Sequence, residues 1–472
     1  MPSPSTPQSR EQRIKEDENV RQRIGPWDPD GLPSLTAFEA DTNFVVKAAA
    51  GSGKTTALVA RMTALLRTGA ATIDQLAAIT FTRKAAAEMK GRFYEELRST
   101  RSRLEKIIQG NEEPPADLTL DGARAQKDRI DQALQSLSRC FIGTVHAFCG
   151  RILRENAFAA GLPPDFEVGI EDDEFDALRA KIWGAYTQKV RGSEKHDKLA
   201  FYGLTPADVE PLFARLSRDP ELEAYTNAPE TPPDLKDVAE EVKAFVEKWN
   251  PIRPSRPSSE PKKAYKQIGR AAAFIENSDL SDGASQARLL SIIKKCDASN
   301  KYKMVGASAW GESGSTAKAE AERLRDEVLP EIFDLIDTVL PAWDACAHRA
   351  AVEFAEPAAE KFWKRRLNEG KLTHHDVLFA TRELLREYPG VRKQVHKRTP
   401  RLLVDEFQDT DPLQAEILFY ITNEKQDIET WRDARPAPGS LFIVGDDKQS
   451  IYRFRRADIN VFEAVVDRVE EA

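Results

Sequence analysis

The stretch "FVVKAAAGSGKTT" (Phe44–Thr56) decides the fold expected for this chain of 472 residues. A brief apolar run enters a glycine-rich loop, and the helical pattern "TTALVARMTALLRTG" follows, with Gly69 as its expected end. A phosphate-binding loop requires this order, because N–H groups of the loop and of the helix N-terminus surround the phosphates. An ordinary glycine-rich turn is the alternative, but the preceding strand and the Gly-Lys-Thr triplet argue against it.

Individual residues of this loop have expected roles. Gly51 and Gly53 let the backbone approach the phosphates, and Lys54 reaches the β and γ oxygens. The Thr55 hydroxyl is expected to ligate Mg²⁺, and Ala48 stands where the general pattern has its first glycine. The predicted nucleotide-binding residues of the loop are Ala48, Ala49, Ala50, Gly51, Ser52, Gly53, Lys54, Thr55 and Thr56.

A second motif, "LLVDEFQDTD" (Leu402–Asp411), carries the expected catalytic acids. Leu402–Val404 predicts a buried strand that leaves Asp405 and Glu406 at its exposed end. We expect Asp405 to hold Mg²⁺ and Glu406 to orient or deprotonate the attacking water. Such a pair alone is usually a solvated turn. Together with the phosphate-binding loop, it predicts phosphoryl transfer from a nucleoside triphosphate to water.

Further apolar runs indicate an α/β fold with a parallel, doubly wound sheet. "LAAIT" (Leu76–Thr80), "FIGT" (Phe141–Thr144) and "SLFIVGDD" (Ser440–Asp447) are strand candidates. Strands followed by helices place the ligand site of such a sheet at the strand C-termini. Residues from about 165 to 370 differ, because they are charged, rich in alanine and leucine, and helical in periodicity. This region predicts a large helical insertion.

The composition excludes several classes of protein. The chain is 41% hydrophobic and 31% charged, which is typical of a globular protein, and it has no apolar run of the roughly 20 residues that span a bilayer. Its four scattered cysteines argue against a disulfide framework or a zinc site and favour a cytoplasmic location. The net charge of −8 means that any DNA contact must depend on local geometry.

Five motifs in order resemble a known family. They are "GSGKT", "TFTRKAAAEM" (Thr80–Met89), "GTVHAFC" (Gly143–Cys149), "VDEFQDTD" (Val404–Asp411) and "VGDDKQSIYRFRRAD" (Val444–Asp458). The set resembles the first half of a superfamily 1 helicase of the UvrD/Rep type. It is most similar to the AddA helicase–nuclease subunits, with RecB more distant. The resemblance implies a RecA-like core, ATP and Mg²⁺ as cofactors, and an ATP-dependent 3′→5′ DNA helicase or translocase of DNA repair or recombination.

The resemblance also implies roles for residues outside the loop and the acidic pair. Gln22 would read adenine, and Gln449 would contact the γ-phosphate and act with Lys54, Asp405 and Glu406 in catalysis. The residues expected to face single-stranded DNA are Phe81, Thr82, His146, Tyr452, Phe454 and Arg455. Aromatic rings stack on any base, which suits a motor that must ignore sequence.

The implied domain arrangement is a core interrupted twice. Residues 1–98, 140–168 and 371–472 would form the RecA-like core, 99–139 a helical excursion and 169–370 the helical insertion domain. Family members continue into a second RecA-like domain with an Asn-Tyr/Phe-Arg segment, and this chain shows no equivalent. We therefore expect the isolated chain to hydrolyse ATP slowly.

The expected partners are single-stranded DNA and duplex junctions, with no membrane. A further partner is an AddB-like subunit or a separate chain that supplies the second motor domain. The alternative function is a nucleotide-responsive single-stranded DNA-binding module, or an assembly subunit, without turnover of its own. An intact water-activating glutamate, Glu406, favours the enzyme.

Two basic runs are weaker signals. "KFWKRRLNEGK" (Lys361–Lys371) and "RKQVHKRTPR" (Arg392–Arg401) could contact DNA, but a solvated helix face is the favoured interpretation. The pair of histidines in "LTHHD" (Leu372–Asp376) suggests a metal site, which we disfavour because similar helicases carry a related segment without a metal.

Overall fold

The computed structural model describes residues 40–47, 53–115, 118–220, 228–251, 262–295, 323–423 and 430–446, and single residues at 319, 425, 428 and 465. The chain separates into two compact units. Unit 1 consists of Met1–Ile170 and Leu367–Ala472, and unit 2 of Glu171–Arg366. The functional division into a motor core, an excursion and an insertion domain stays a prediction.

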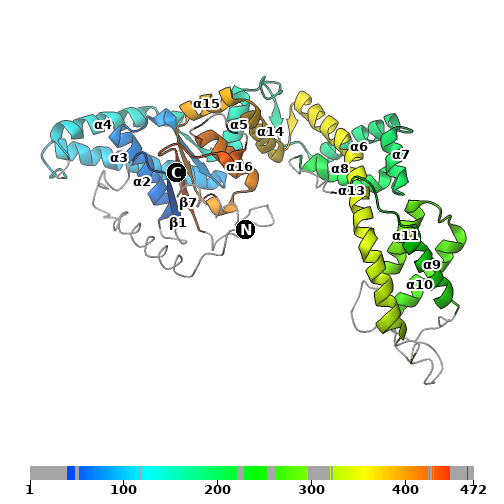
Figure 1. The fold of residues 1–472 in the computed structure, drawn as a ribbon. Coiled ribbons are helices and arrows are strands. Elements are labelled where there is room, and N and C mark those ends of the chain that lie inside the picture. Colours follow the sequence, from blue (N-terminus) through cyan, green and yellow to red (C-terminus); the bar gives the residue numbers. More distant parts are fainter. Residues whose placement is uncertain are drawn as a thin grey trace. The chain divides into compact units, whose positions relative to one another are not determined.

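Unit 1 contains a parallel sheet, so the predicted α/β fold class is confirmed (Figure 1). Every pair of neighbouring strands in it is parallel, and the order among the described residues is β1-β7-β6-β2-β3. Strands β2 and β7 are buried along their whole length, as expected where helices cover both faces. The strands are β1 (Phe44–Lys47), β2 (Leu76–Thr80), β3 (Phe141–Thr144), β6 (Arg401–Val404) and β7 (Leu441–Gly445).

Helices cover both faces of this sheet. Figure 1 shows α2 (Lys54–Thr68), α3 (Arg83–Ile108) and α4 (Leu120–Gln135) together on one side. On the other side lie α5 (Val145–Glu155), α14 (His374–Glu387), α15 (Pro389–Arg398) and α16 (Pro412–Thr422). Helix α2 ends at Gly69 as predicted, because this residue adopts φ 81°, a conformation that glycine tolerates best.

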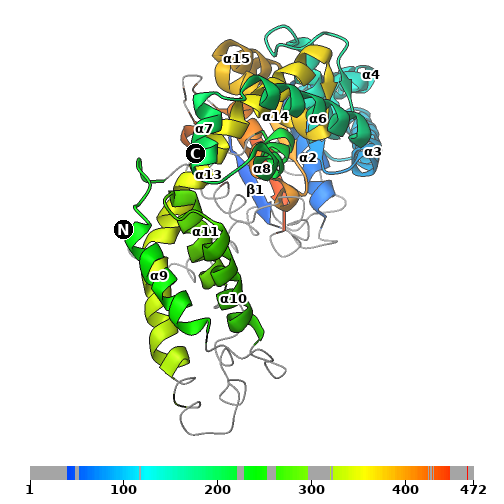
Figure 2. The same cartoon turned by 90° about the vertical axis from the view of Figure 1, so that its right-hand side faces the viewer.

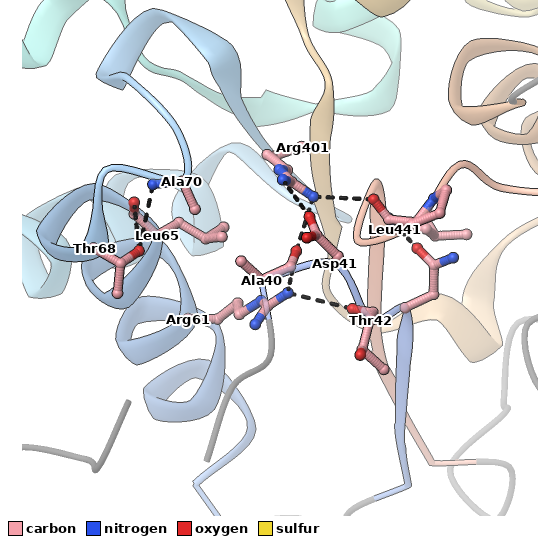
Figure 3. A network of polar contacts seen from close by, with 11 residues as sticks. Ala40, Asp41, Thr42, Arg61, Leu65, Thr68, Ala70, Arg401 and Leu441 are labelled. Carbon is pink, nitrogen blue, oxygen red and sulfur yellow. Dashed lines mark hydrogen bonds and ion pairs between the residues drawn. The ribbon is translucent and has the colours of Figure 1, made fainter. Parts of the chain in front are cut away.

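Polar contacts join the amino ends of three strands (Figure 3). Arg401, the first residue of β6, donates to the carbonyl oxygens of Ala40 and Pro438 at 2.9 and 3.1 Å. Arg61 of α2 donates to the carbonyls of Ala40 and Thr42, both at 3.3 Å, and its guanidinium lies 5.2 Å from the Phe44 ring centroid. These contacts hold the amino ends of β1, β6 and β7 together. They do not involve the residues at the carboxyl ends of the strands.

A short strand pair in unit 1 brackets the helical region. Strand β4 (Glu167–Val168) pairs in parallel with β5 (Lys371–Leu372). Gly370, just before β5, has φ 66°, and an added Cβ would lie 2.7 Å from the Pro163 ring. The chain thus leaves and re-enters unit 1 at one place.

No helix in the described part of the chain is long and apolar enough to cross a membrane.

Unit 2 is helical, as the periodicity predicts. Figure 2 shows α9 (Lys236–Trp249), α10 (Lys262–Asn277) and α11 (Gly283–Lys294) beside the long α13 (Leu329–Glu369), with which they share a hydrophobic core. The other described helices are α6 (Asp172–Lys189), α7 (Glu194–Phe201) and α8 (Pro206–Arg218), and α13 follows a π-helical turn (Leu324–Val328). Pro357 inside α13 cannot donate to the Glu353 carbonyl, and Lys195 Nζ donates to it instead at 3.3 Å.

Most cations of the two basic runs are exposed, as a solvated helix face predicts, but two of their arginines are buried. Arg366 is fully buried, with its guanidinium 4.8 Å from the Phe175 ring centroid and 4.6 Å from that of Phe362. Arg392 is also buried and donates to the carbonyl of Leu385 at 2.9 Å. Both arginines pack inside their units, so neither DNA contact nor a solvated face describes them. Sequence periodicity did not predict their burial, because a long cationic side chain can donate hydrogen bonds to carbonyl oxygens and lie against aromatic rings inside the protein.

Candidate functional site

The carboxyl edge of the sheet brings Lys54 to the acidic motif. Gly53 adopts φ 91° directly before α2, so Lys54 is the first helical residue. Its Nζ lies 2.8 Å from Glu406 Oε2, although 352 residues separate the two in the chain. Lys54 is only 8% exposed, so this ammonium group is held largely away from solvent. Two predicted catalytic residues thus meet.

The loop after β6 is shaped by its own hydrogen bonds. Asp405 N donates to the carbonyl of Ile79 on β2 at 2.9 Å and continues the strand pairing by one residue. Glu406 N donates to Asp405 Oδ1 at 3.0 Å, and Glu406 has φ 53°. Among the residues that the structure describes, Glu406 is the only non-glycine residue with a positive φ. Such strained backbone costs of order 1–3 kcal/mol and is concentrated at functional sites.

Gln408 orients Glu406, a role that sequence reasoning did not assign. It lies in the short helical turn η6 (Phe407–Asp409), and its Nε2 donates to Glu406 Oε2 at 2.6 Å. Its Oε1 accepts a hydrogen bond from Asp446 N, directly after β7, at 2.9 Å. Gln408 therefore links the ends of two strands to the carboxylate. Its place within "VDEFQDTD" was the available signal.

Burial changes the acidity of two carboxyl groups here. The pKa of Asp405 is raised to about 6, first by burial and then by the Glu406 carboxylate, while Lys54 and a hydrogen bond with the Thr55 side chain act in the opposite direction. The pKa of Asp409 is also raised to about 6, by burial and by Glu406. The prediction that Asp405 lies at an exposed strand end was wrong, because it is 8% exposed.

The donor set fits Mg²⁺ and a nucleotide phosphate. Thr55 and Asp405 offer a hydroxyl and a carboxylate oxygen in hydrogen-bond contact, and Mg²⁺ prefers such oxygen ligands. No cluster of three metal-ligating side chains occurs among the described residues. Mg²⁺ is commonly held by one or two carboxylates together with substrate phosphates, so this donor set is adequate. Asp409 Oδ1, buried and without a hydrogen-bond partner among the described residues, adds an acceptor nearby.

Three of the residues expected to face DNA lie along the same edge. Thr80 of β2 is in register with Thr144 of β3, so the residues that follow both strands are neighbours. Phe81 is half-buried, and the side chain of Thr82 accepts from Ala85 N at 3.0 Å to cap α3. The segment that leaves β2 thus lies between the acidic loop after β6 and the start of α5.

His146 lies in the first turn of α5. Its ring centroid is 5.7 Å from that of His374, edge to face. Burial, together with His374 and His375, lowers the pKa of His146 to about 4. His146 is therefore neutral near pH 7 and can take part in hydrogen bonds but not in ion pairs.

Several predicted site residues lie outside the described residues. They are Gln22, Ala48, Ala49, Ala50, Gly51, Ser52, Gln449, Tyr452, Phe454 and Arg455. Thr56, in the first turn of α2, is described. The roles given to all of these residues stay predictions.

Comparison with known proteins places this geometry in a family. The model of the UvrD/REP helicase N-terminal domain matches residues 34–470. An ATP-dependent helicase/nuclease subunit of Carboxydothermus hydrogenoformans is 28% identical over 92% of the chain, and its counterpart in Enterococcus faecalis is 25% identical over 90%. The chain spans only 36% and 34% of these relatives, about a third of their length. Residues 34–470 cover nearly the whole chain, which therefore belongs to the family of UvrD/REP helicase N-terminal domains.

Proposed function

We propose that this chain is the first motor domain of an ATP-dependent 3′→5′ DNA helicase or translocase of the UvrD/AddA type, acting in DNA repair or recombination. The 2.8 Å contact between Lys54 and Glu406 supports this most directly, because it joins the phosphate-binding helix to the acidic loop. The family supplies the expected substrate, and the strand polarity is taken from it alone.

The proposed chemistry uses the two partners of this ion pair separately. Lys54 Nζ would move from Glu406 to the β and γ oxygens of ATP and neutralise their charge. Glu406, released and held by Gln408, would accept a proton from water as the water oxygen attacks the γ-phosphorus. The bond from the γ-phosphorus to the β–γ bridging oxygen then breaks, and ADP and phosphate leave.

Thr55 and Asp405 would hold Mg²⁺ with the nucleotide. When bound, the ion neutralises charge on the phosphate oxygens. Asp405 can serve only when ionised, so its raised pKa makes this step sensitive to pH below neutrality. Ala48–Thr56 would surround the phosphates, and Gln22 would contact adenine.

The DNA strand would pass over the ends of β2 and β3. Phe81 would stack on bases, and Thr82 and His146 would contact the strand through hydrogen bonds. Tyr452, Phe454 and Arg455 would complete the surface, and Gln449 would connect it to the γ-phosphate.

Two further proposals concern the chain in its setting. Tested alone, the chain would turn ATP over slowly, because an arginine finger supplied by another domain accounts for about 10³–10⁵ in rate. An AddB-like subunit or a chain with the second motor domain would be its partner, in the cytoplasm. ATP hydrolysis by the isolated chain at tens of turnovers per second would exclude the proposal of slow turnover.

The test is single-turnover ATP hydrolysis with and without oligothymidylate. We expect DNA to accelerate the wild type, and Lys54→Ala to lower the rate by at least about 10²–10³-fold, the effect of removing one charge-stabilising donor. Phe81→Ala should keep the basal rate and lose the stimulation by DNA. Lys106→Ala, an exposed lysine on α3, is the control. A wild type that binds ATP yet is no faster than Lys54→Ala would support the binding-module alternative.

A further inference from the structure

A pocket of about 470 Å³ lies between α3 and α5, beside the end of β3. Arg83 and Lys90 line it from α3, and His146, Gly150 and Arg154 line it from α5, with His374 at one side. Because His146 belongs to this lining, the pocket adjoins the proposed path of the DNA strand.

The pocket is basic in an acidic protein. Among the described residues that line it, none is acidic, although the chain as a whole has 77 acidic and 69 basic residues. Arg83, Lys90 and Arg154 form no ion pair with any other described residue. Their charges therefore add up within the pocket rather than being cancelled by neighbours.

Some other cations on the same two helices form ion pairs. On α3, Arg92 pairs with Glu88 at 2.6 Å. On α5, Arg151 pairs with Glu155 at 3.0 Å. Lys84 and Lys106 of α3 also form no ion pair with a described residue, so the lack of an ion pair does not by itself mark the pocket. What marks it is its lining, in which three cations come together and no acidic residue lies beside them, and this suits an anionic ligand.

The pocket also holds one of its cations in place. The Arg154 guanidinium lies 5.0 Å from the Phe166 ring centroid, a cation–π distance, and its NH1 donates to the Gly150 carbonyl at 3.4 Å. An added Cβ at Gly150 would come within 3.3 Å of that guanidinium group. Gly150 therefore leaves the space that the Arg154 guanidinium occupies at the pocket wall.

We propose that this pocket binds the phosphodiester backbone of the single DNA strand through Lys90 and Arg154, one from each wall. The proposal rests on the proposed function and extends it, because neither residue lies in the motifs that predict DNA contacts. Lys90 stands seven positions after Arg83, about 10 Å along α3, so cations follow the helix away from the sheet edge. Phosphate contacts of this kind position a strand without reading its sequence.

The test is the salt dependence of binding to a fluorescein-labelled oligothymidylate, followed by anisotropy without nucleotide. For a single strand, log K falls with log salt by about 0.7 for each phosphate contact. Lys90→Ala and Arg154→Ala should each reduce that slope by about 0.7, which corresponds to about fivefold weaker binding near 0.1 M salt. Arg154→Lys should restore most of the slope, because it keeps the charge.

Matched controls separate this inference from the proposed function. Lys106→Ala on α3 and Arg151→Ala on α5 remove cations outside the pocket and should leave the slope unchanged. Phe81→Ala should weaken binding with the slope retained, because stacking is uncharged. If Lys90→Ala and Arg154→Ala match these controls while Phe81→Ala weakens binding, the pocket proposal is wrong and the motor proposal stands. A wild type that binds no oligonucleotide removes both.

Discussion

The two edges of the sheet both bury a positively charged side chain, and they surround it differently. At the amino edge, Arg61 is 2% exposed and donates to the backbone carbonyls of Ala40 and Thr42 (Figure 3). Its guanidinium also lies against the ring of Phe44. At the carboxyl edge, Lys54 is 8% exposed and bonds to the carboxylate of Glu406. Carbonyls are fixed partners that cannot change charge, whereas a carboxylate on a short loop can move and can take up a proton.

The electrostatic response differs in the same way. Burial and the nearby Arg401 lower the pKa of Arg61 to about 10, so it stays charged near neutral pH. At the carboxyl edge the pKa of Asp405 rises to about 6, and Glu406 is held at φ 53°. Perturbed carboxyl groups beside strained backbone are concentrated where chemistry occurs. The comparison therefore supports the proposal that one edge serves stability and the other turnover.

The largest expected effect is on turnover at the carboxyl edge. Glu406→Gln should lower single-turnover ATP hydrolysis by about 10²–10⁴-fold, because the amide cannot accept the proton of water. The unfolding free energy should also fall, because the buried ammonium group of Lys54 loses the charge of its partner, although the amide oxygen can still accept a hydrogen bond from it. Urea unfolding and rapid-quench assays measure the two quantities. Glu88→Gln on α3 is the control, and a variant Glu406→Gln that keeps most of its rate contradicts the assignment.

The next effect is on stability at the amino edge. Gly439 has φ 67°, and an added Cβ would overlap the Ala40 carbonyl oxygen and the Arg401 guanidinium. Gly439→Ala should cost roughly 2–5 kcal/mol, about 1–2 for the left-handed backbone and 1–3 for overpacking. The hydrolysis rate per folded molecule should be unchanged. Gly390→Ala, at the second residue of α15, meets nothing within 4 Å and should be neutral or slightly stabilising in the same urea titration. Equal unfolding midpoints for the two variants would remove the distinction between the edges.

The sequence predicted where the strands lie better than how the loop after β6 turns. Short apolar runs located β1, β2, β3, β6 and β7, and the burial of β2, β6 and β7 is that of parallel strands covered on both faces. The meeting of Lys54 with Glu406 was predictable, since the motifs place both at carboxyl ends of strands. The backbone strain at Glu406 was not, because it depends on how η6 turns back toward β7.

Long cations were the least predictable residues. Arg366 and Arg392 belong to basic runs that suggest exposure, yet both are buried on rings or carbonyls. The opposite holds for Lys90 and Arg154, which are distant in sequence and line one pocket only because α3 and α5 pack beside β3. Whether a basic side chain is buried, paired or unpaired is decided by tertiary neighbours that periodicity does not report.

The raised pKa of Asp405 predicts a smaller effect, a pH dependence of Mg²⁺ affinity and of stability at the carboxyl edge. Asp405 must be ionised to hold Mg²⁺, so affinity for Mg²⁺ should fall by up to about tenfold per pH unit below about 6. The sign for folding is opposite. A carboxyl group with a raised pKa stabilises the fold below its unfolded pKa of 3.8, and this contribution is lost as pH rises to about 6.

Calorimetric Mg²⁺ titration with ADP between about pH 5 and 8 measures the first effect. Asp405→Asn should bind Mg²⁺ more weakly and remove most of the pH dependence. Asp409→Asn, which removes the other carboxyl group with a pKa of about 6, should retain that dependence. If Asp409→Asn loses more of the Mg²⁺ affinity and of its pH dependence than Asp405→Asn does, the metal ligand is Asp409 and not Asp405.

The smallest effect tests whether stability alone can alter turnover. Gly91 lies within α3, and an added Cβ there would meet nothing within 4 Å. Gly91→Ala should raise the unfolding free energy by about 0.5–1 kcal/mol, because alanine loses less backbone entropy in a helix. Since the residue belongs to neither edge, the hydrolysis rate should stay at the wild-type value. A rate that rises or falls together with stability in Gly91→Ala and Gly439→Ala would mean that global stability governs turnover, and the separation of roles between the edges would then fail.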